Sequence, residues 1–207
     1  MSKAPPRLIL ASASPRRRQI LRRCGLSFTT HPGRLHEDHR AGESPRRRAR
    51  RLAIMKARAI AVRLRKPAWV MGSDTIVVVG DHMLGKPRDD PQAARMLARL
   101  SGRWHSVISA VALLPARIPD GQAHDGWRLT RVRFSRLTPE HIRWILEARE
   151  HRDKAGAYAV QGRAGAFIRE IRGSCSNVAG LPLELAATLL GRAGFLPAPS
   201  GRRTSHS

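Results

Sequence analysis

The sequence predicts an α/β domain, and three observations lead to that prediction. Short apolar stretches that suit strands alternate along the 207 residues with segments whose apolar residues follow helical spacing. With 42% hydrophobic residues, the chain can bury one core, so we expect a single domain over 1–196 and a disordered basic tail at 197–207. Four helical segments begin with Ser, Thr or Asp followed by Pro, a pair typical of a helix N-terminus. These pairs are 14–15, 44–45, 90–91 and 138–139.

The first strand, turn and helix are expected at residues 8–23. Three apolar residues are followed by small ones, and Pro15 then opens a run in which Arg fills much of the surface. Hydroxyl groups in the turn, backbone N–H groups at the positive end of a helix dipole and nearby guanidinium groups are the parts of an anion site. Ser12, Ser14, Arg16 and Arg17 are therefore candidate phosphate ligands, although an ordinary strand–helix unit with a solvated basic helix has the same pattern.

The next segments predict a strand, a polar loop and a long helix. Residues 26–30 suit a strand, 31–43 are polar, and the apolar residues between 49 and 64 follow helical spacing. Lys56 lies on or beside the apolar stripe of this helix, where it either extends its ammonium group to solvent or contacts phosphate. The Arg run at 46–51 resembles a nucleic-acid patch, but most such runs are solvated helix faces.

A polar interruption divides the apolar segment 69–79. Its residues are Gly72-Ser73-Asp74-Thr75, and we expect Asp74 at a strand end, where open α/β sheets place their ligands. Asp is common in turns, but between two buried strands it is costly unless it is paired or bound to metal, so a functional Asp74 is favoured. A hairpin turn at 80–81 then leads to a rigid loop that carries Lys86.

The second half of the chain predicts further strands and helices. Residues 153–162 are mostly small and end in Gln161-Gly162, and small residues allow close approach of the backbone to a ligand. Gln161 carries both a donor and an acceptor, which suits recognition of a base edge. The expected elements are strands at 105–114, 128–135 and 166–171, helices from 90–91 and 138–139, and a last helix that ends at 191.

Charge and cysteine content restrict the class of protein. The formal net charge is +24, but the 34 Arg and 5 Lys residues are spread over the whole chain, which fits a compositional bias as well as a binding surface. We therefore expect no nucleic-acid partner. Cys24 and Cys175 make no metal-binding spacing, no signal peptide is visible, and the longest apolar run, 107–114, is too short to span a bilayer. A cytoplasmic protein without membrane contact is expected.

The polar loop contains one segment that resembles a metal site. In His36-Glu37-Asp38-His39, two histidines flank two carboxylates, but adjacent loop histidines are more often only solvated. A carboxylate in this loop that assists a magnesium ion is the stronger hypothesis, because magnesium prefers oxygen ligands.

Taken together, the motifs resemble the Maf family of nucleoside triphosphate pyrophosphatases. Each motif alone is weak, but their order and spacing from about residue 7 to 191 match those of the family. They are Leu10-Ala-Ser-Ala-Ser-Pro-Arg-Arg17, Glu43-Ser-Pro45, Lys56-Ala57, Gly72-Ser-Asp-Thr75, Leu84-Gly-Lys-Pro87, Leu100-Ser-Gly102, Asp153-Lys-Ala-Gly156, Gln161-Gly162 and Asn177-Val-Ala-Gly-Leu-Pro182.

The resemblance implies a fold and an activity. The fold would be a long mixed β-sheet flanked by helices, with a deep nucleotide cleft between two lobes, often in a homodimer. The activity would be hydrolysis of a nucleoside triphosphate between its α and β phosphates with Mg²⁺ or Mn²⁺, which yields the monophosphate and pyrophosphate. Such an enzyme removes unwanted nucleotides from the cellular pool.

The resemblance also implies roles for individual residues. Arg16, Lys56 and Lys86 would hold the polyphosphate, and Asp74 would activate the attacking water as a general base or with a metal. Glu37 and Glu43 would assist the metal or the fold, with Asp74 as a further metal ligand. The nucleotide pocket would be lined by Ser12, Arg17, Thr75 and Gln161.

Three positions favour the dTTP/UTP branch of the family. They are Arg16, Thr75 and Gln161, since the branch that acts on 7-methyl-GTP typically has a different residue after Ser-Pro, Gln in place of Thr75 and Glu in place of Gln161. A 7-methyl-GTP pyrophosphatase is the first alternative. A non-catalytic protein that regulates septation or binds nucleic acid is the second, and it predicts salt-sensitive DNA binding that survives the loss of Asp74.

Overall fold

The computed structural model describes residues 7–33, 37–38, 40–118 and 121–196. Over these residues the strands are β1 (Arg7–Leu10), β2 (Thr29–Thr30), β3 (Ala68–Val79), β4 (His82–Leu84), β5 (Trp104–Ala116), β6 (His124–Phe134) and β7 (Ile168–Arg172). The helices are α1 (Pro15–Arg23), α2 (Pro45–Ala61), α3 (Asp90–Leu100), α4 (Pro139–Glu147), α5 (Cys175–Val178) and α6 (Leu183–Arg192). Two short 3₁₀ segments, η1 (Ala155–Ala157) and η2 (Arg163–Phe167), precede β7.

The described strands form one mixed sheet. Its order is β2-β1-β3-β5-β6-β7, with β4 paired to β3. β1 runs parallel to β2 and β3, whereas β3, β5, β6 and β7 pair antiparallel. The expected α/β class with a long mixed sheet is confirmed.

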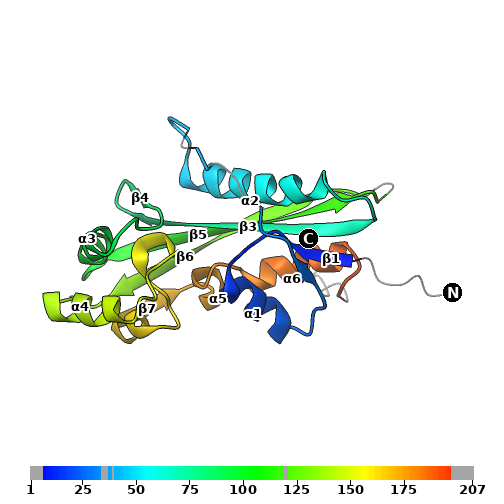
Figure 1. Cartoon of the computed structure of the whole chain (residues 1–207). Coiled ribbons are helices and arrows are strands. Elements are labelled where there is room, and N and C mark those ends of the chain that lie inside the picture. The colour runs from blue at the N-terminus through cyan, green and yellow to red at the C-terminus, as the bar shows by residue number, and fades with distance from the viewer. Residues whose placement is uncertain (1–6, 34–36, 39, 119–120, 197–207) are drawn as a thin grey trace, which may run out of the picture.

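Helices cover both faces of the sheet (Figure 1). Of the described helices, only α2 lies over one face, while α1, α5 and α6 lie under one end of the opposite face and α3 and α4 lie at its other end. All four predicted Ser/Thr/Asp-Pro helix starts are found, because Pro lacks an N–H that the first turn would leave unbonded anyway. The cap of α3 is Asp89, one residue before the predicted Asp90, and its side chain accepts from the Gln92 N–H.

The face opposite α2 carries two separate apolar cores. Met71, Val111 and Leu113 contribute to the core under α1 and α6, and Val77 and Val107 contribute to the core against α3 and α4. Between them, the inward positions of the same strands are Ser73, Thr75 and Ser109. Side chains alternate along a strand, so these three residues form a polar strip on that face. The strip separates the two apolar cores, and each core with its helices forms one lobe.

The prediction that the 69–79 segment is broken at Gly72–Thr75 is wrong in one respect. β3 is a continuous strand of 12 residues, and Asp74 lies in its middle and not at its end. The strand continues because β5 pairs with it along eleven consecutive residues, from 68 to 78. Only the side chains become polar there.

Of the other elements predicted from the sequence, one is confirmed and one is shorter than expected. The hairpin at 80–81 is confirmed by the β3–β4 pair, and the strand expected at 26–30 is reduced to Thr29–Thr30. None of the described helices is both long enough and apolar enough to cross a membrane. The predicted tail at 197–207 and the histidines His36 and His39 lie outside the described residues.

Candidate active site

An open stretch on one edge of β3 creates the site. β1 pairs with residues 68–71 of β3, and β4 pairs with residues 77–79 on the same edge. Within the described ranges, no strand pairs with the residues between them on that edge. The chain leaves β1 there to enter α1, and a gap of this kind at the end of a strand is where α/β sheets bind ligands.

A glycine brings α2 close to this gap. A Cβ atom at Gly72 would lie only 2.1 Å from the carbonyl oxygen of Ala53 and 2.8 Å from the N of Ala57. The absence of a side chain therefore lets the backbone of α2 rest directly on β3. Lys56 lies between these two helix positions, and this close packing puts it within reach of Asp74.

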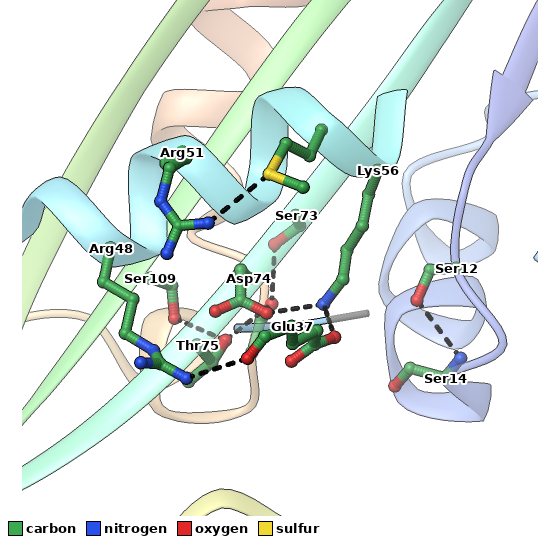
Figure 2. Close-up of polar contacts among 12 residues, drawn as sticks. Ser12, Ser14, Glu37, Arg48, Arg51, Lys56, Ser73, Asp74, Thr75 and Ser109 are labelled. Carbon is green, nitrogen blue, oxygen red and sulfur yellow. Dashed lines mark hydrogen bonds and ion pairs between the residues drawn. The ribbon is translucent and has the colours of Figure 1, made fainter. Parts of the chain in front are cut away.

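Lys56 makes two ion pairs inside the cleft. Its Nζ lies 2.6 Å from Oδ1 of Asp74 and 2.7 Å from Oε1 of Glu37. Figure 2 shows Lys56 reaching from α2 towards both carboxylates. Only 7% of Asp74 is exposed, whereas Glu37 lies nearer to solvent. The ammonium group thus satisfies one buried carboxylate and draws the Glu37 segment into the same site.

The two carboxylates respond differently to this environment. Burial raises the pKa of Asp74, and the charges of Lys56 and Arg17 oppose that rise without cancelling it. Partial burial would also raise the pKa of Glu37, but its hydrogen bond to Lys56 and the charges of Lys56, Lys86 and Arg17 outweigh burial and lower it. Asp74 is therefore the better proton acceptor of the two.

Arg17 fixes the floor of the cleft. Its Nε donates to the carbonyl oxygen of Gly180 at 2.8 Å, and its Nη1 donates to that of Ser73 at 2.7 Å. Nη1 and Nη2 also contact the hydroxyl groups of Ser12 and Thr75, at 3.4 and 3.2 Å. Burial lowers the pKa of Arg17, while Asp74 and Glu37 partly offset that effect. The guanidinium therefore ties α1 to β3 and to the 177–180 turn.

Asn177 holds that turn in place. Its side-chain amide nitrogen donates to the carbonyl oxygen of Val107 at 3.0 Å and to the hydroxyl of Thr130 at 2.9 Å. Ser109, on β5, donates to the carbonyl oxygen of Asn177 and bonds Thr75 at 2.9 Å. The Asn177–Pro182 motif is thus a structural anchor, and it delivers the Gly180 carbonyl to Arg17.

The start of α1 forms a second wall. The N–H of Ser14 donates to the Ser12 hydroxyl at 3.2 Å, and the Ser14 side chain makes no capping hydrogen bond. The first N–H groups of this helix are therefore available to an anion. Nε of Arg16 is buried and has no hydrogen-bond partner among the residues described. Burial, and then the charge of Arg17, lowers the pKa of Arg16.

Tyr158, which lines the cleft, is paired with a buried histidine. The hydroxyl of Tyr158 lies 2.8 Å from Nε2 of His105, and both side chains are buried. Burial lowers the pKa of His105 to about 4, so the imidazole is neutral at physiological pH. Burial also raises the pKa of Tyr158. A neutral pair here presents no charge to the ligand.

The resulting cleft has a volume of about 620 Å³. Among the described residues, six cationic side chains line it against three carboxylates, which suits a polyanionic ligand. The cations are Arg16, Arg17, Arg48, Lys56, Lys86 and Lys154; the carboxylates are Glu37, Asp74 and Asp153.

The structure brings most of the predicted site residues together. The predicted residues that line the cleft are Ser12, Arg16, Arg17, Glu37, Lys56, Asp74, Thr75 and Lys86. Glu43 and Gln161 are not among the lining residues. Glu43 makes a two-point ion pair with Arg51, at 2.6 Å for each contact, so of its two predicted roles the geometry fits the one in the fold. Gln161 is exposed in the turn after Tyr158.

Sequence reasoning missed the polar lining residues Arg48, Asp153, Lys154 and Tyr158. Lys154 and Tyr158 belong to the small-residue segment that the sequence singled out, but only Gln161 was chosen from it. The Arg run at 46–51 predicts a solvated helix face, but Arg48 points into the cleft. Spacing could have found it, since Arg48, Leu52 and Lys56 recur every four residues on one side of α2.

The carboxylates of the cleft are suited to a metal ion that binds together with the nucleotide. Glu37 and Asp74 converge on one cation, the ammonium of Lys56. Over the described ranges, no group of three or more His, Cys, Asp or Glu side chains could hold a metal ion. Mg²⁺ often uses one or two carboxylates, water and substrate phosphates, so two carboxylates in a cleft for polyanions are sufficient.

These features define an α/β protein with a cationic cleft built around a buried carboxylate. The family model described as "Maf-like protein" matches residues 7–193, and the chain belongs to this family. A protein of Anaeromyxobacter dehalogenans strain 2CP-1 named dTTP/UTP pyrophosphatase is 47% identical over 92% of this chain and 95% of its own length. Proteins of the same name from Symbiobacterium thermophilum and Myxococcus xanthus are 46% and 44% identical, over 91% and 93% of this chain and 94% of their own lengths.

Among solved structures, a dITP/XTP pyrophosphatase from Mycobacterium abscessus shows a weak likeness. It is 20% identical, and the alignment covers 63% of this chain and 74% of that one with a TM-score of 0.36. This likeness is too low to support an argument about function.

Proposed function

We propose that the protein hydrolyses dTTP and UTP to the nucleoside monophosphate and pyrophosphate. The observation that carries the proposal is the buried Asp74 carboxylate in a cleft with an excess of cations. Relatives that are 44–47% identical over almost the whole chain are named for this activity. As expected from the sequence, this reaction would remove pyrimidine triphosphates from the nucleotide pool.

Cationic groups on three sides of the cleft bind the phosphate chain. Arg16 and the free N–H groups of α1 lie on one side, Lys56 on α2 on another, and Lys86 on the loop after β4 at the exposed rim. They offset the charge of the triphosphate and of the pyrophosphate that leaves.

Asp74 acts as the general base. A bond forms between a water oxygen and phosphorus, the bond from that phosphorus to the oxygen bridging the α and β phosphates breaks, and the water proton passes to Asp74. Burial raises the pKa of Asp74, which makes it a stronger base than an ordinary carboxylate. A divalent cation, Mg²⁺ or Mn²⁺, would supply charge neutralisation on the phosphates, and Asp74 and Glu37 would hold it.

Thr75 supports the pyrimidine preference. The residue lines the cleft, and Ser109, Arg17 and the Gly180 carbonyl hold its hydroxyl, so the side chain that the resemblance associates with this branch is fixed at the cleft wall. Gln161 contributes no wall to the cleft in the described structure, and its role in base recognition stays a prediction. A homodimer and a cytoplasmic location also stay predictions; light scattering and cell fractionation would check them.

The test is pyrophosphate release from dTTP, UTP, CTP, 7-methyl-GTP and dITP with Mg²⁺. We expect release from dTTP and UTP, with kcat reduced ~10²- to 10⁴-fold in Asp74→Asn. Asp81→Asn, an exposed carboxylate in the β3–β4 turn, is the matched control and should keep full activity. Preference for 7-methyl-GTP would assign the other branch of the family. No release from any nucleotide by folded protein would contradict the proposal and favour a binding role.

A further inference from the structure

The five arginines at 46–51 of α2 have different surroundings. The guanidinium of Arg46 lies over the ring of Trp127, 4.5 Å from its centroid, and Arg50 pairs with Asp125. Arg51 makes the two-point pair with Glu43, and Arg47 is exposed. Arg48 alone among the five lines the cleft.

Arg48 has an incomplete set of contacts there. Its Nη2 donates to the backbone oxygen of Glu37 at 3.3 Å, whereas its Nη1 is buried without a hydrogen-bond partner in the described part of the chain. A buried, charged donor without an acceptor is unfavourable, so a guanidinium held in this state is suited to an anion that arrives later. Figure 2 shows Arg48 and Lys56 extending from α2 towards the same Glu37.

Arg48 adds a second cationic group to the wall of the cleft that α2 forms, beyond Lys56. Arg48 and Lys56 are eight residues apart on one side of α2, which corresponds to ~12 Å along the helix axis. Lys56 contacts Asp74, where the bond is cleaved in the proposed function. A guanidinium further along the wall can form two parallel hydrogen bonds to phosphate oxygens, which an ammonium group cannot.

We propose that Arg48 binds the pyrophosphate portion of the nucleotide, and that its bond to Glu37 couples this residue to that phosphate. The proposal rests on the function proposed above and adds a substrate-binding residue to it. Arg48 would then strengthen binding of the triphosphate and of the pyrophosphate product. It would contribute little to binding of the monophosphate, which lacks the β and γ phosphates.

The experiment compares Arg48→Met with Arg47→Met, which removes an equal charge from the neighbouring, exposed position of the same helix. We expect Arg48→Met to raise KM for dTTP and the inhibition constant of pyrophosphate by ~10-fold or more, with a smaller change in kcat. The inhibition constant of dTMP should change less than ~2-fold, and Arg47→Met should resemble wild type throughout. Equal pyrophosphate inhibition of the two variants would overturn the proposal.

A third variant separates phosphate binding from support of Glu37. Arg48→Gln keeps a side-chain hydrogen-bond donor but loses the charge, so it should bind pyrophosphate as weakly as Arg48→Met. Wild-type affinity in Arg48→Gln would overturn the proposal, because support of Glu37 would then account for the effect.

Calorimetric titration measures pyrophosphate binding without catalytic turnover. If wild type bound pyrophosphate through Arg48 but cleaved no nucleotide, the proposed function alone would fail. Matching thermal unfolding midpoints establish that the variants fold.

Discussion

Lys56 on α2 donates to Asp74 on β3, with Nζ and Oδ1 2.6 Å apart, and the same ammonium group lies 2.7 Å from Glu37. The two carboxylates proposed to hold a divalent cation therefore already share a cation that belongs to the protein. Without substrate, a metal must compete with Lys56. Triphosphate oxygens would give Lys56 another partner and bring additional ligands for the metal.

Replacement of Lys56 should therefore strengthen metal binding in the absence of nucleotide. In Lys56→Met at pH 8 we expect Mn²⁺ to bind ~5- to 10-fold more tightly, which corresponds to about 1 kcal/mol of relieved competition. Electron paramagnetic resonance of free Mn²⁺ measures this directly. Lys66→Met, at an exposed position beyond α2, is the control. Equal or weaker Mn²⁺ binding by Lys56→Met would contradict the shared-cation interpretation.

The pH dependence of catalysis should report Asp74. Burial raises the pKa of Asp74, so the acid limb of kcat/KM should lie above the ordinary Asp value of ~3.9. Lys56 lowers that pKa, and its removal in Lys56→Met should move the acid limb to higher pH even though the maximal rate falls. Rate profiles from pH 4 to 9 would measure the shift. An acid limb that stays in place would mean that another group controls it.

Gly72 should be intolerant of a side chain. The added methyl group of Gly72→Ala would meet the Ala53 carbonyl at 2.1 Å and push α2 away from β3. We expect a loss of about 1–3 kcal/mol in the free energy of unfolding, measured in urea, together with a lower kcat because Lys56 is displaced from Asp74. Gly85→Ala, where a Cβ would meet nothing within 4 Å, should keep wild-type stability. A stable, fully active Gly72→Ala would contradict this explanation of how α2 is positioned.

The buried His105 should make the fold sensitive to acid. Its pKa is lowered from 6.5 to about 4, so between these values the unfolded chain binds a proton that the folded protein does not. The stability that neutral His105 provides is complete above pH 6.5 and is lost as the pH falls towards 4. From pH 7.5 to 5.0 this amounts to about 2 kcal/mol. Urea unfolding of wild type and His105→Gln would measure it, since the variant lacks this component; parallel pH profiles would refute it.

Patterns in the sequence predicted the fold class and most of the cleft. Alternating apolar segments and Pro at the helix starts located the elements, and the Ser12–Arg17 and Asp74–Thr75 motifs line the cleft as predicted. Asp74 was nevertheless expected at a strand end. Composition shows where side chains become polar, but pairing with a distant β5 decides whether the backbone continues.

Three further residues show why the rest of the site could not be predicted from the sequence. Gln161 has a suitable side chain but lies in an exposed turn, and Glu43 has a suitable charge but is held by Arg51, eight residues away. Arg48 was hidden because a run of arginines looks uniform in sequence. Its neighbours find partners on β6 and in the loop before α2, and only three-dimensional packing distinguishes them.

The polar strip of Ser73, Thr75 and Ser109 also affects how the molecule should unfold. It leaves the apolar cores of the two lobes joined on that face mainly by the backbones of β3 and β5, so amide hydrogen exchange should identify two separately protected regions. A nucleotide lying across the strip would contact both lobes at once, through α1 on one side and η1 on the other. Ligand binding should then merge the two regions into one cooperative unit, which would resist local opening and proteolysis along the whole sheet.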